Sequence, residues 1–256
     1  MKPLDTPFRW DDIVLPPHVL TQLRDLAARA QRLAPEDGDG KRSERGDTSQ
    51  SGLCALFTGP SGTGRTMAAQ ILARELGRKL LHVDATELVG KFIGETEKNL
   101  SRVFSRARGS EAVLLFDEAD ALFGRRTEVR NASDRYANAV TDYLLSRIET
   151  FAGLVILKSN SGDDIDIALK RQGLFIVAFP YPDEQDRSRI WRKVFPVETT
   201  LAQGVDHALL GRRFRLTGRQ IRNAAMAAAR TAGRGDGVVH LQNVAGCAER
   251  ERDEAD

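Results

Sequence analysis

The stretch of sequence that decides the fold is Gly59-Pro60-Ser61-Gly62-Thr63-Gly64-Arg65-Thr66. It follows an apolar run at residues 53–57 and precedes a helical run at residues 67–76. A glycine-rich turn between a strand and a helix can point several backbone N–H groups inward, where they surround a phosphate. The positive end of the helix dipole adds to this preference for an anion. The stretch therefore predicts a phosphate-binding loop.

The pattern G-x-x-x-x-G-K-[ST] fits this loop at every fixed position but one, because Arg65 stands where lysine is expected. The hydroxyl of Thr66 is placed to ligate a magnesium ion. A glycine-rich turn that binds nothing is the alternative, and a second motif downstream disfavours it. The predicted nucleotide-binding residues are Gly59, Pro60, Ser61, Gly62, Thr63, Gly64, Arg65, Thr66 and Met67.

The second motif is an apolar run at residues 112–116 that ends in Asp117-Glu118. A continuous apolar run suits a strand that is buried on both faces of a parallel sheet. Strand alternation sends the two carboxylates in different directions, so that Asp117 can hold magnesium while Glu118 faces a nucleophilic water. The alternative is an acidic turn after a core strand. The phosphate-binding loop about fifty residues upstream favours the first interpretation.

Further apolar runs complete a predicted sheet. They lie at residues 80–83, at 153–160, which ends in Asn160, and at 174–179, which stops at Pro180. Strands that alternate with helices predict a doubly wound α/β fold, in which ligands bind at the carboxyl ends of the strands. The loop, the Asp117-Glu118 pair and Asn160 all lie at such ends, so we expect them to converge on one site.

Bulk composition sets limits on the class of protein. Lys and Arg number 38 and Asp and Glu 36 in 256 residues, so a net charge of +2 does not suggest a nucleic-acid partner. Two cysteines cannot form a disulfide framework. We find no signal core at the N-terminus and no run of 18 apolar residues, and we therefore expect a cytoplasmic protein with no membrane partner.

The chain divides into segments of distinct character. We expect an N-terminal lead-in and helix at 1–34, a flexible polar loop at 35–52, a large α/β nucleotide-binding subdomain at 53–182, a small helical lid at 183–248 and a charged tail at 249–256. Thr217 is the expected N-cap of a lid helix. Seven arginines and no acidic residue lie between Arg212 and Arg234. A solvated face or a subunit contact accounts for them better than a nucleic-acid surface.

From about Phe8 to Gly246 the order of these pieces resembles a AAA ATPase module. Gly59–Thr66 resembles Walker A, Leu114–Glu118 resembles Walker B, and Asn160 occupies the place of sensor 1. The resemblance implies a P-loop NTPase parallel sheet sandwiched by helices and followed by a small all-helical lid subdomain. It also implies ATP and Mg²⁺ as cofactors, and it places Arg219 near the position of a sensor 2 residue.

Other stretches carry the resemblance further. Lys91-Phe92-Ile93-Gly94 resembles the first pore loop, whose aromatic residue grips a protein substrate in the channel of a hexameric ring. An aromatic residue in a glycine-bracketed loop can also be a packing residue. Residues 127–138, 143–149 and 179–184 together resemble a bacterial AAA branch, some members of which accompany contractile injection systems.

Two departures from the AAA pattern keep two functions open. One is Arg65; the other is the arginine-finger segment, where Arg171 matches the first arginine and Leu174 replaces the second. The first hypothesis is a ring-forming ATPase that remodels or assembles a protein complex, with Glu118, Asn160 and Arg171 as catalytic residues and Thr66 and Asp117 as magnesium ligands. The second is a nucleotide-binding assembly or regulatory module with little or no hydrolysis, which Arg65 and Leu174 favour.

Overall fold

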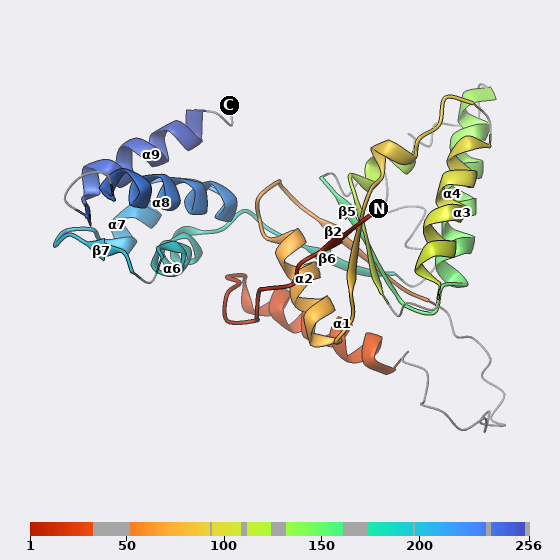
Figure 1. Ribbon diagram of the computed structural model, residues 1–256, viewed down its shortest axis with the longest axis horizontal. Helices are drawn as coiled ribbons and strands as arrows, with labels where there is room; N and C mark the ends of the chain where they lie inside the picture. Colours follow the sequence, from red (N-terminus) through yellow and green to blue (C-terminus); the bar gives the residue numbers. More distant parts are fainter. Residues whose placement is uncertain are drawn as a thin grey trace. The chain divides into compact units, whose positions relative to one another are not determined.

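The computed structural model describes residues 1–32, 52–92, 94–108, 112–123, 132–160, 174–196, 198–233 and 237–253. Most of the polar loop predicted at 35–52, Ile93 of the predicted pore loop and Arg171 lie outside these residues. The chain forms two compact units, which we describe separately (Figure 1). The first comprises Met1–Arg9, His18–Gly59 and Thr66–Ala178, and the second Trp10–Pro17, Pro60–Arg65 and Phe179–Asp256.

A six-stranded sheet forms the centre of the first unit. Its order is β1 (Lys2–Leu4), β3 (Leu80–Asp84), β4 (Val113–Asp117), β5 (Leu154–Ser159), β2 (Leu53–Thr58) and β6 (Phe175–Ala178). β1 pairs antiparallel with β3, and every other neighbouring pair in this sheet is parallel. The α/β fold class predicted from the sequence is confirmed. The short edge strand β1 was not predicted.

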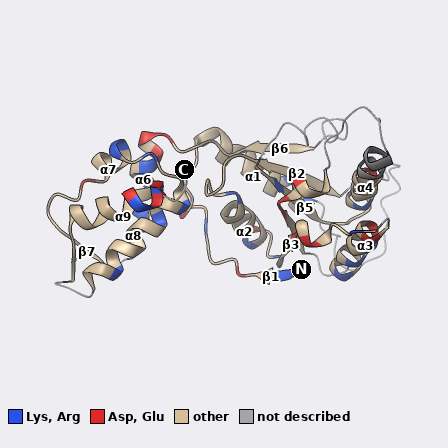
Figure 2. Cartoon of the chain, turned by 90° about the horizontal axis from the view of Figure 1, so that it is seen from above, with Lys and Arg blue, Asp and Glu red and all other residues tan. Residues whose placement is uncertain are grey.

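Helices cover both faces of this sheet (Figures 1 and 2). α1 (Pro17–Arg32) and α2 (Arg65–Glu75) lie on one face, and α3 (Glu95–Ala107) and α4 (Ala132–Glu149) lie on the other. Two short 3₁₀ helices, η1 (Thr86–Leu88) and η2 (Ala119–Leu122), follow β3 and β4. The arrangement leaves the carboxyl ends of the parallel strands at one edge of the sheet, where η1 and η2 begin.

Strand alternation decides which side chains of β4 and β5 face which helices. Phe116 and Leu157 are register partners and pack in the core with Leu100 and Phe104 of α3. Burial of a side chain of this size stabilises the fold by about 1.5–3 kcal/mol. The next residue of each strand points to the opposite face. The apolar core under α3 therefore sets the orientation of the polar residues that follow.

The second unit is mainly helical. It contains α6 (Glu184–Val194), α7 (His207–Arg213), α8 (Gly218–Ala232) and α9 (Leu241–Asp253) around a core that includes the fully buried Trp191. Thr217 is the N-cap of α8, as the sequence predicted. It also forms a capping box with Gln220, which was not predicted. A parallel two-stranded ladder, β7 (Thr200–Leu201) with β8 (Val238–Val239), adds to the helical lid that we expected.

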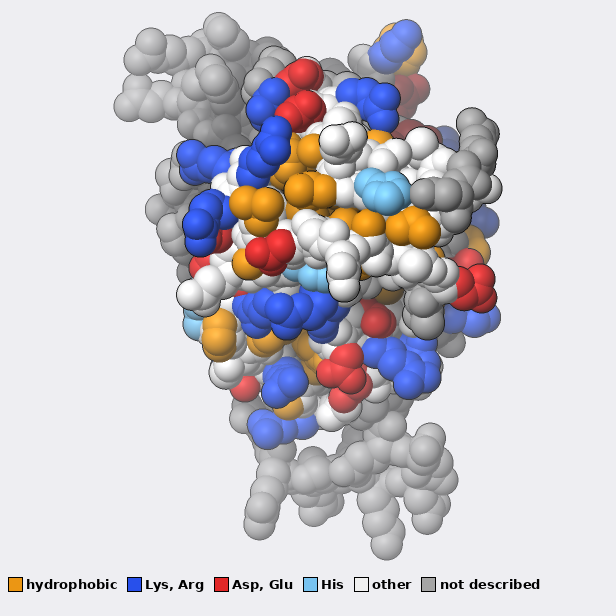
Figure 3. All heavy atoms as spheres, turned by 90° about the vertical axis from the view of Figure 1, so that its left-hand side faces the viewer, with side chains coloured by type: hydrophobic (Ala, Val, Ile, Leu, Met, Phe, Trp, Pro, Cys, Tyr) orange, Lys and Arg blue, Asp and Glu red, His pale blue; other side chains and the backbone are white. Residues whose placement is uncertain are grey.

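Arginines of the second unit pair with acidic side chains from neighbouring helices. Arg212 contacts Glu184 at 3.2 Å, and Arg213 contacts Glu249 at 3.1 Å. Figure 3 shows basic and acidic side chains interspersed on this side of the unit rather than a single basic field. This distribution favours a solvated, charge-paired face over a nucleic-acid surface. Within the described part of the chain, no helix has the length and apolar character needed to cross a membrane.

Two apolar residues near the start of α3 are expected to differ in their effect on stability. Leu100 is fully buried, whereas 71% of Phe92 is exposed. Leu100→Ala should lower the free energy of unfolding by about 2–5 kcal/mol, because it leaves a cavity. Phe92→Ala should change it by less than about 0.5 kcal/mol. Urea unfolding of the two variants measures both; an equal loss for Phe92→Ala would place Phe92 in the core.

Candidate functional site

The predicted phosphate-binding loop connects β2 to α2, and its glycines adopt backbone conformations that other residues rarely take. The φ angles are +132° at Gly59, +82° at Gly62 and +107° at Gly64. Inside the loop, the hydroxyl of Thr63 donates to the carbonyl of Pro60 at 2.9 Å. A loop of this kind fits the predicted phosphate cradle, because repeated positive φ angles turn the chain sharply and bring backbone N–H groups together.

Within the second unit, the loop packs closely against the N-terminus of α8. The carbonyl of Gly62 accepts the backbone N–H of Arg219 at 3.1 Å. A Cβ atom on Gly62 would lie only 2.6 Å from Oγ1 of Thr217. Arg219, the residue that we expect near the sensor 2 position, is thus attached to the loop through its backbone.

The side chain of Arg65, the first residue of α2, is buried, with 4% of its surface exposed. Arginine differs from lysine in its length and its planar head group. Its burial shows that the protein accommodates the longer side chain inside the fold rather than leaving it in solvent.

The end of β4 carries the predicted acidic pair in a constrained turn. Glu118 has φ +52° and ψ +42°, and it is the one non-glycine residue with positive φ in the described ranges. Its N–H donates to Oδ1 of Asp117 at 2.9 Å, and its side chain is exposed. A non-glycine residue in this conformation costs free energy and is typical of functional sites. Glu118 lies just beyond β4, so the direction of its side chain is set by this left-handed turn and not by the strand alternation that we expected.

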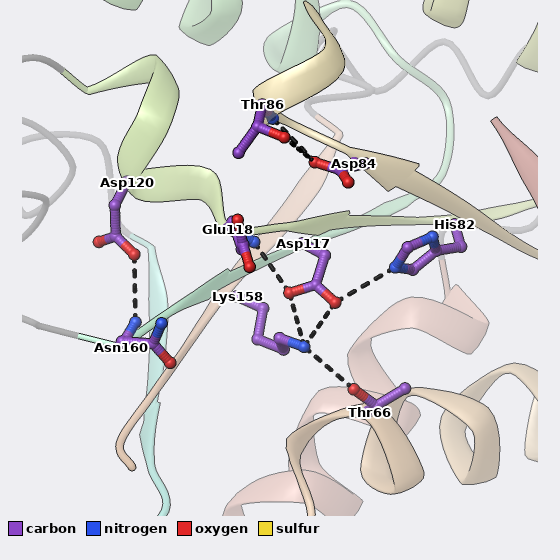
Figure 4. Close-up of polar contacts among 9 residues, drawn as sticks. All are labelled: Thr66, His82, Asp84, Thr86, Asp117, Glu118, Asp120, Lys158 and Asn160. Atoms are coloured by element: carbon purple, nitrogen blue, oxygen red, sulfur yellow. Dashed lines mark hydrogen bonds and ion pairs between the residues drawn. The ribbon is translucent and has the colours of Figure 1, made fainter. Parts of the chain in front are cut away.

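Asp120, in η2, connects the end of β4 to the end of β5 through hydrogen bonds. Its carboxylate accepts the hydroxyl of Ser159 and, at 3.2 Å, the backbone N–H of Asn160. Asn160 is therefore held at the same edge of the sheet as Glu118, where we expected the two to meet (Figure 4). Neither Asp120 nor Ser159 was predicted from the sequence to belong to the site.

The carboxylate of Asp117 is surrounded by donors from other elements (Figure 4). Nζ of Lys158, on β5, lies 2.6 Å from both carboxylate oxygens, and Nε2 of His82, on β3, lies 3.2 Å from Oδ2. Lys158 also contacts Oγ1 of Thr66, on α2, at 3.2 Å. Burial alone would raise the pKa of Asp117, but the hydrogen bonds with His82 and Lys158, together with the charge of Lys158, hold that pKa well below its usual range.

Thr66 and Asp117 are the two residues predicted to ligate magnesium, and hydroxyl and carboxylate oxygens are the donors that this ion prefers. In the structure these oxygens are bridged by the ammonium group of Lys158. An ammonium group and a divalent cation repel each other at such distances, so the two do not fit between Thr66 and Asp117 together. No cluster of three His, Cys, Asp or Glu side chains suited to a metal occurs in the described ranges.

Backbone hydrogen bonds fix the predicted pore loop and leave its aromatic side chain exposed. Oε2 of Glu95 accepts the N–H groups of Lys91 and Phe92 at 3.0 and 3.2 Å. Gly90 donates to the buried hydroxyl of Thr96 at 3.0 Å. A Cβ on Gly90 would lie 2.2 Å from Cβ of Glu95, so this close approach requires glycine. Phe92 is thus a surface residue on an anchored loop.

Leu174, which stands at the second position of the predicted arginine finger, packs against the core of the first unit. Because its side chain makes apolar contacts there, an apolar residue such as leucine suits this position.

Sequence reasoning missed Lys158 and His82. The signal for Lys158 was present, because a lysine that follows four apolar residues inside a buried strand needs a partner for its charge. His82 carried no such signal, since its contact with Asp117 depends on the pairing of β3 with β4.

Comparison with known proteins places the chain in a family. The model of the family described as "ATPase family associated with various cellular activities (AAA)" matches residues 55–182. A proteasome-activating nucleotidase of Methanopyrus kandleri is 35% identical over 158 residues, 59% of this chain and 36% of that protein. Those of Methanococcus vannielii and Saccharolobus islandicus are 35% and 33% identical over 54% and 53% of this chain. The chain spans about a third of the length of these relatives. The matched part is 35% of the Methanococcus vannielii protein and 36% of the Saccharolobus islandicus protein.

A substitution at Gly62 tests the contact between the loop and α8. Gly62→Ala should destabilise the protein, because the new methyl group meets both a positive φ and the hydroxyl of Thr217. Gly77→Ala is a matched control, since φ is +64° there but no atom lies within 4 Å of the new Cβ. We expect a cost of about 1–2 kcal/mol for the control and a larger one for Gly62→Ala in urea unfolding. Equal costs would contradict the close contact.

Proposed function

Because this chain belongs to the AAA family of ATPases, we propose that it binds ATP at residues 59–66 and hydrolyses it to remodel or assemble a protein complex. The observation that supports this most strongly is the polar edge of the parallel sheet. Glu118 follows β4, Asn160 follows β5, and Asp120 holds the two strand ends together. These are the positions at which an open α/β sheet binds its ligand.

Each residue at this edge has a proposed role. Glu118 accepts a proton from the attacking water, for which its exposed carboxylate is suited. Asn160 orients that water through its amide. The strained turn at Glu118 and the hydrogen bonds of Asp120 keep these two side chains at fixed strand ends, which lowers the reorganisation needed for reaction.

The family binds ATP with Mg²⁺, which neutralises charge on the phosphates. Thr66 and Asp117 are the oxygen donors that the sequence predicted for this ion, but the ammonium group of Lys158 bridges them. The magnesium site is therefore the part of the proposed function that fits the structure least well.

Assembly is the second part of the proposal. If Arg171 acts on the nucleotide of a neighbouring subunit, the site is incomplete within one chain, and head-to-tail contacts that close into a ring complete it. A hexameric ring is the arrangement that we expect. The exposed Phe92, on a loop anchored by Glu95, would then contact a protein substrate in the channel. An aromatic side chain can hold an extended polypeptide without reading its sequence.

A nucleotide-binding assembly or regulatory module with little hydrolysis is the second candidate. Specific observations favour it: Arg65 is buried at the position of the loop lysine, Leu174 is a packing residue, and Lys158 stands between the proposed magnesium ligands. An arginine finger supplied in trans contributes about 10³–10⁵ in rate, so loss of part of it would slow turnover. The intact Glu118 favours the first candidate.

Steady-state ATP hydrolysis by the Glu118→Gln variant distinguishes the two. We expect turnover to fall at least about 100-fold, because the water loses its base, while the affinity for ATP stays unchanged. The assay is run at protein concentrations that permit ring formation. Glu87→Gln, which neutralises an exposed carboxylate on η1, is the matched control and should keep the parent rate.

The outcomes are separable. Hydrolysis by Glu118→Gln at the parent rate would remove Glu118 from the mechanism. A parent protein that binds ATP without measurable turnover would favour the regulatory module. A parent protein that shows no nucleotide binding would contradict both candidates.

A further inference from the structure

The group that holds Asp117 and Thr66 together is a cation of the protein itself. Nζ of Lys158 lies 2.6 Å from each oxygen of Asp117 and 3.2 Å from Oγ1 of Thr66 (Figure 4). The three residues come from β5, β4 and α2. Their meeting point is therefore set by the central sheet and one packed helix, not by a loop.

The carboxylate of Asp117 has no oxygen without a donor. Oδ2 contacts His82 and Lys158, and Oδ1 contacts Lys158 and the N–H of Glu118. An ionised carboxylate offers about four acceptor positions, and these contacts use them. A divalent ion, or a water bound to it, could reach Asp117 only by displacing one of these donors.

The position of Lys158 is also well fixed. It follows the buried residues Leu154–Leu157 of β5, which pairs with β4 on one side and with β2 on the other. Only 16% of its side chain is exposed. A lysine at such a place in the strand directs its ammonium group to the nearest acceptors, because a buried charge without partners is costly.

We propose that Lys158 is a built-in cation that takes the place of the divalent ion, so that this chain binds nucleoside triphosphate with little dependence on magnesium. The inference rests on the proposed function, since it concerns nucleotide bound at the loop that ends in Thr66. A lysine ammonium is a point charge that binds phosphate well. It supplies one positive charge beside Thr66, where magnesium would supply two, and slow hydrolysis follows from the smaller charge.

The test compares the affinity for a slowly hydrolysed ATP analogue in magnesium and in EDTA, measured by calorimetry. For the parent protein we expect the two affinities to agree within about threefold. In Lys158→Gln the amide still donates to Asp117 but carries no charge. In that variant, the affinity measured in magnesium should exceed the affinity measured in EDTA by at least about tenfold. Lys158→Met is a second variant without hydrogen bonding, and melting temperatures confirm that each variant folds.

Lys98→Gln is the matched control. It removes the same charge from an exposed position on α3, and it should keep the parent ratio of affinities. Strong magnesium dependence in the parent protein would overturn the proposal. A ratio of the two affinities near one in both the parent and the Lys158 variants would also overturn it, because binding without magnesium would then not depend on Lys158.

A nucleotide-free measurement separates failure of this inference from failure of the proposed function. Absence of analogue binding in every condition would contradict the proposed function. Titration with manganese(II) alone, followed by electron paramagnetic resonance, then decides the inference. We expect Lys158→Gln to gain one manganese site that a further Asp117→Asn substitution removes, and the parent protein to lack it. A manganese site at Asp117 in the parent protein, or no gain in Lys158→Gln, would overturn the proposal.

Discussion

The lateral pairing of β4 with β5 is the constraint on which the site depends. Leu114, Leu115 and Phe116 pair with Val155, Ile156 and Leu157, and these six apolar side chains are fully buried. A slip by one residue would send the apolar side chains to the wrong face, so the register is strongly specified. The residues that follow, Asp117 and Lys158, are carried to the same point by the same register. Asp120 then joins the two strand ends through Ser159 and Asn160.

The balance of charges around Asp117 links the fold to the proposed function. Asp117 is held ionised by Lys158 and His82, and its acceptor positions are filled. Such a carboxylate is poorly available to an added ion, whereas the exposed carboxylate of Glu118 is available to water. The arrangement thus keeps the carboxylate that we propose as the catalytic base and places a lysine ammonium group at the neighbouring Asp117. Under the proposed function, this combination corresponds to a protein that binds nucleotide and turns it over slowly.

Much of the fold could be predicted from the sequence, because its signals are local. Apolar runs marked the central strands, the glycine pattern marked the turn before α2, and the N-cap residue Thr217 marked the start of α8. The short strands β1, β7 and β8 escaped prediction, since two or three residues carry no measurable period. The fold class and the family are confirmed, whereas the roles of Arg171, Ile93 and the polar loop at 35–52 stay predictions.

The residues of the candidate site that belong to a sequence motif could be predicted. The residues that reach the site through the packing of other strands could not. Glu118, Asn160 and Asp117 lie at strand ends as expected, but the partners of Asp117 come from strands far away in the sequence. His82 and Lys158 reach Asp117 only because β3, β4 and β5 are neighbours in the sheet. The order of strands in a sheet is a tertiary property, so these contacts cannot be read from the sequence alone.

A crystal structure with a slowly hydrolysed ATP analogue and manganese tests whether Lys158 replaces the divalent ion. Anomalous scattering locates manganese independently of the nucleotide. We expect triphosphate density at residues 59–66, the ammonium group of Lys158 still between Thr66 and Asp117, and no manganese peak between those two residues. A manganese peak bonded to Thr66 and Asp117, with Lys158 turned away, would contradict this expectation, as would a loop that holds no phosphate.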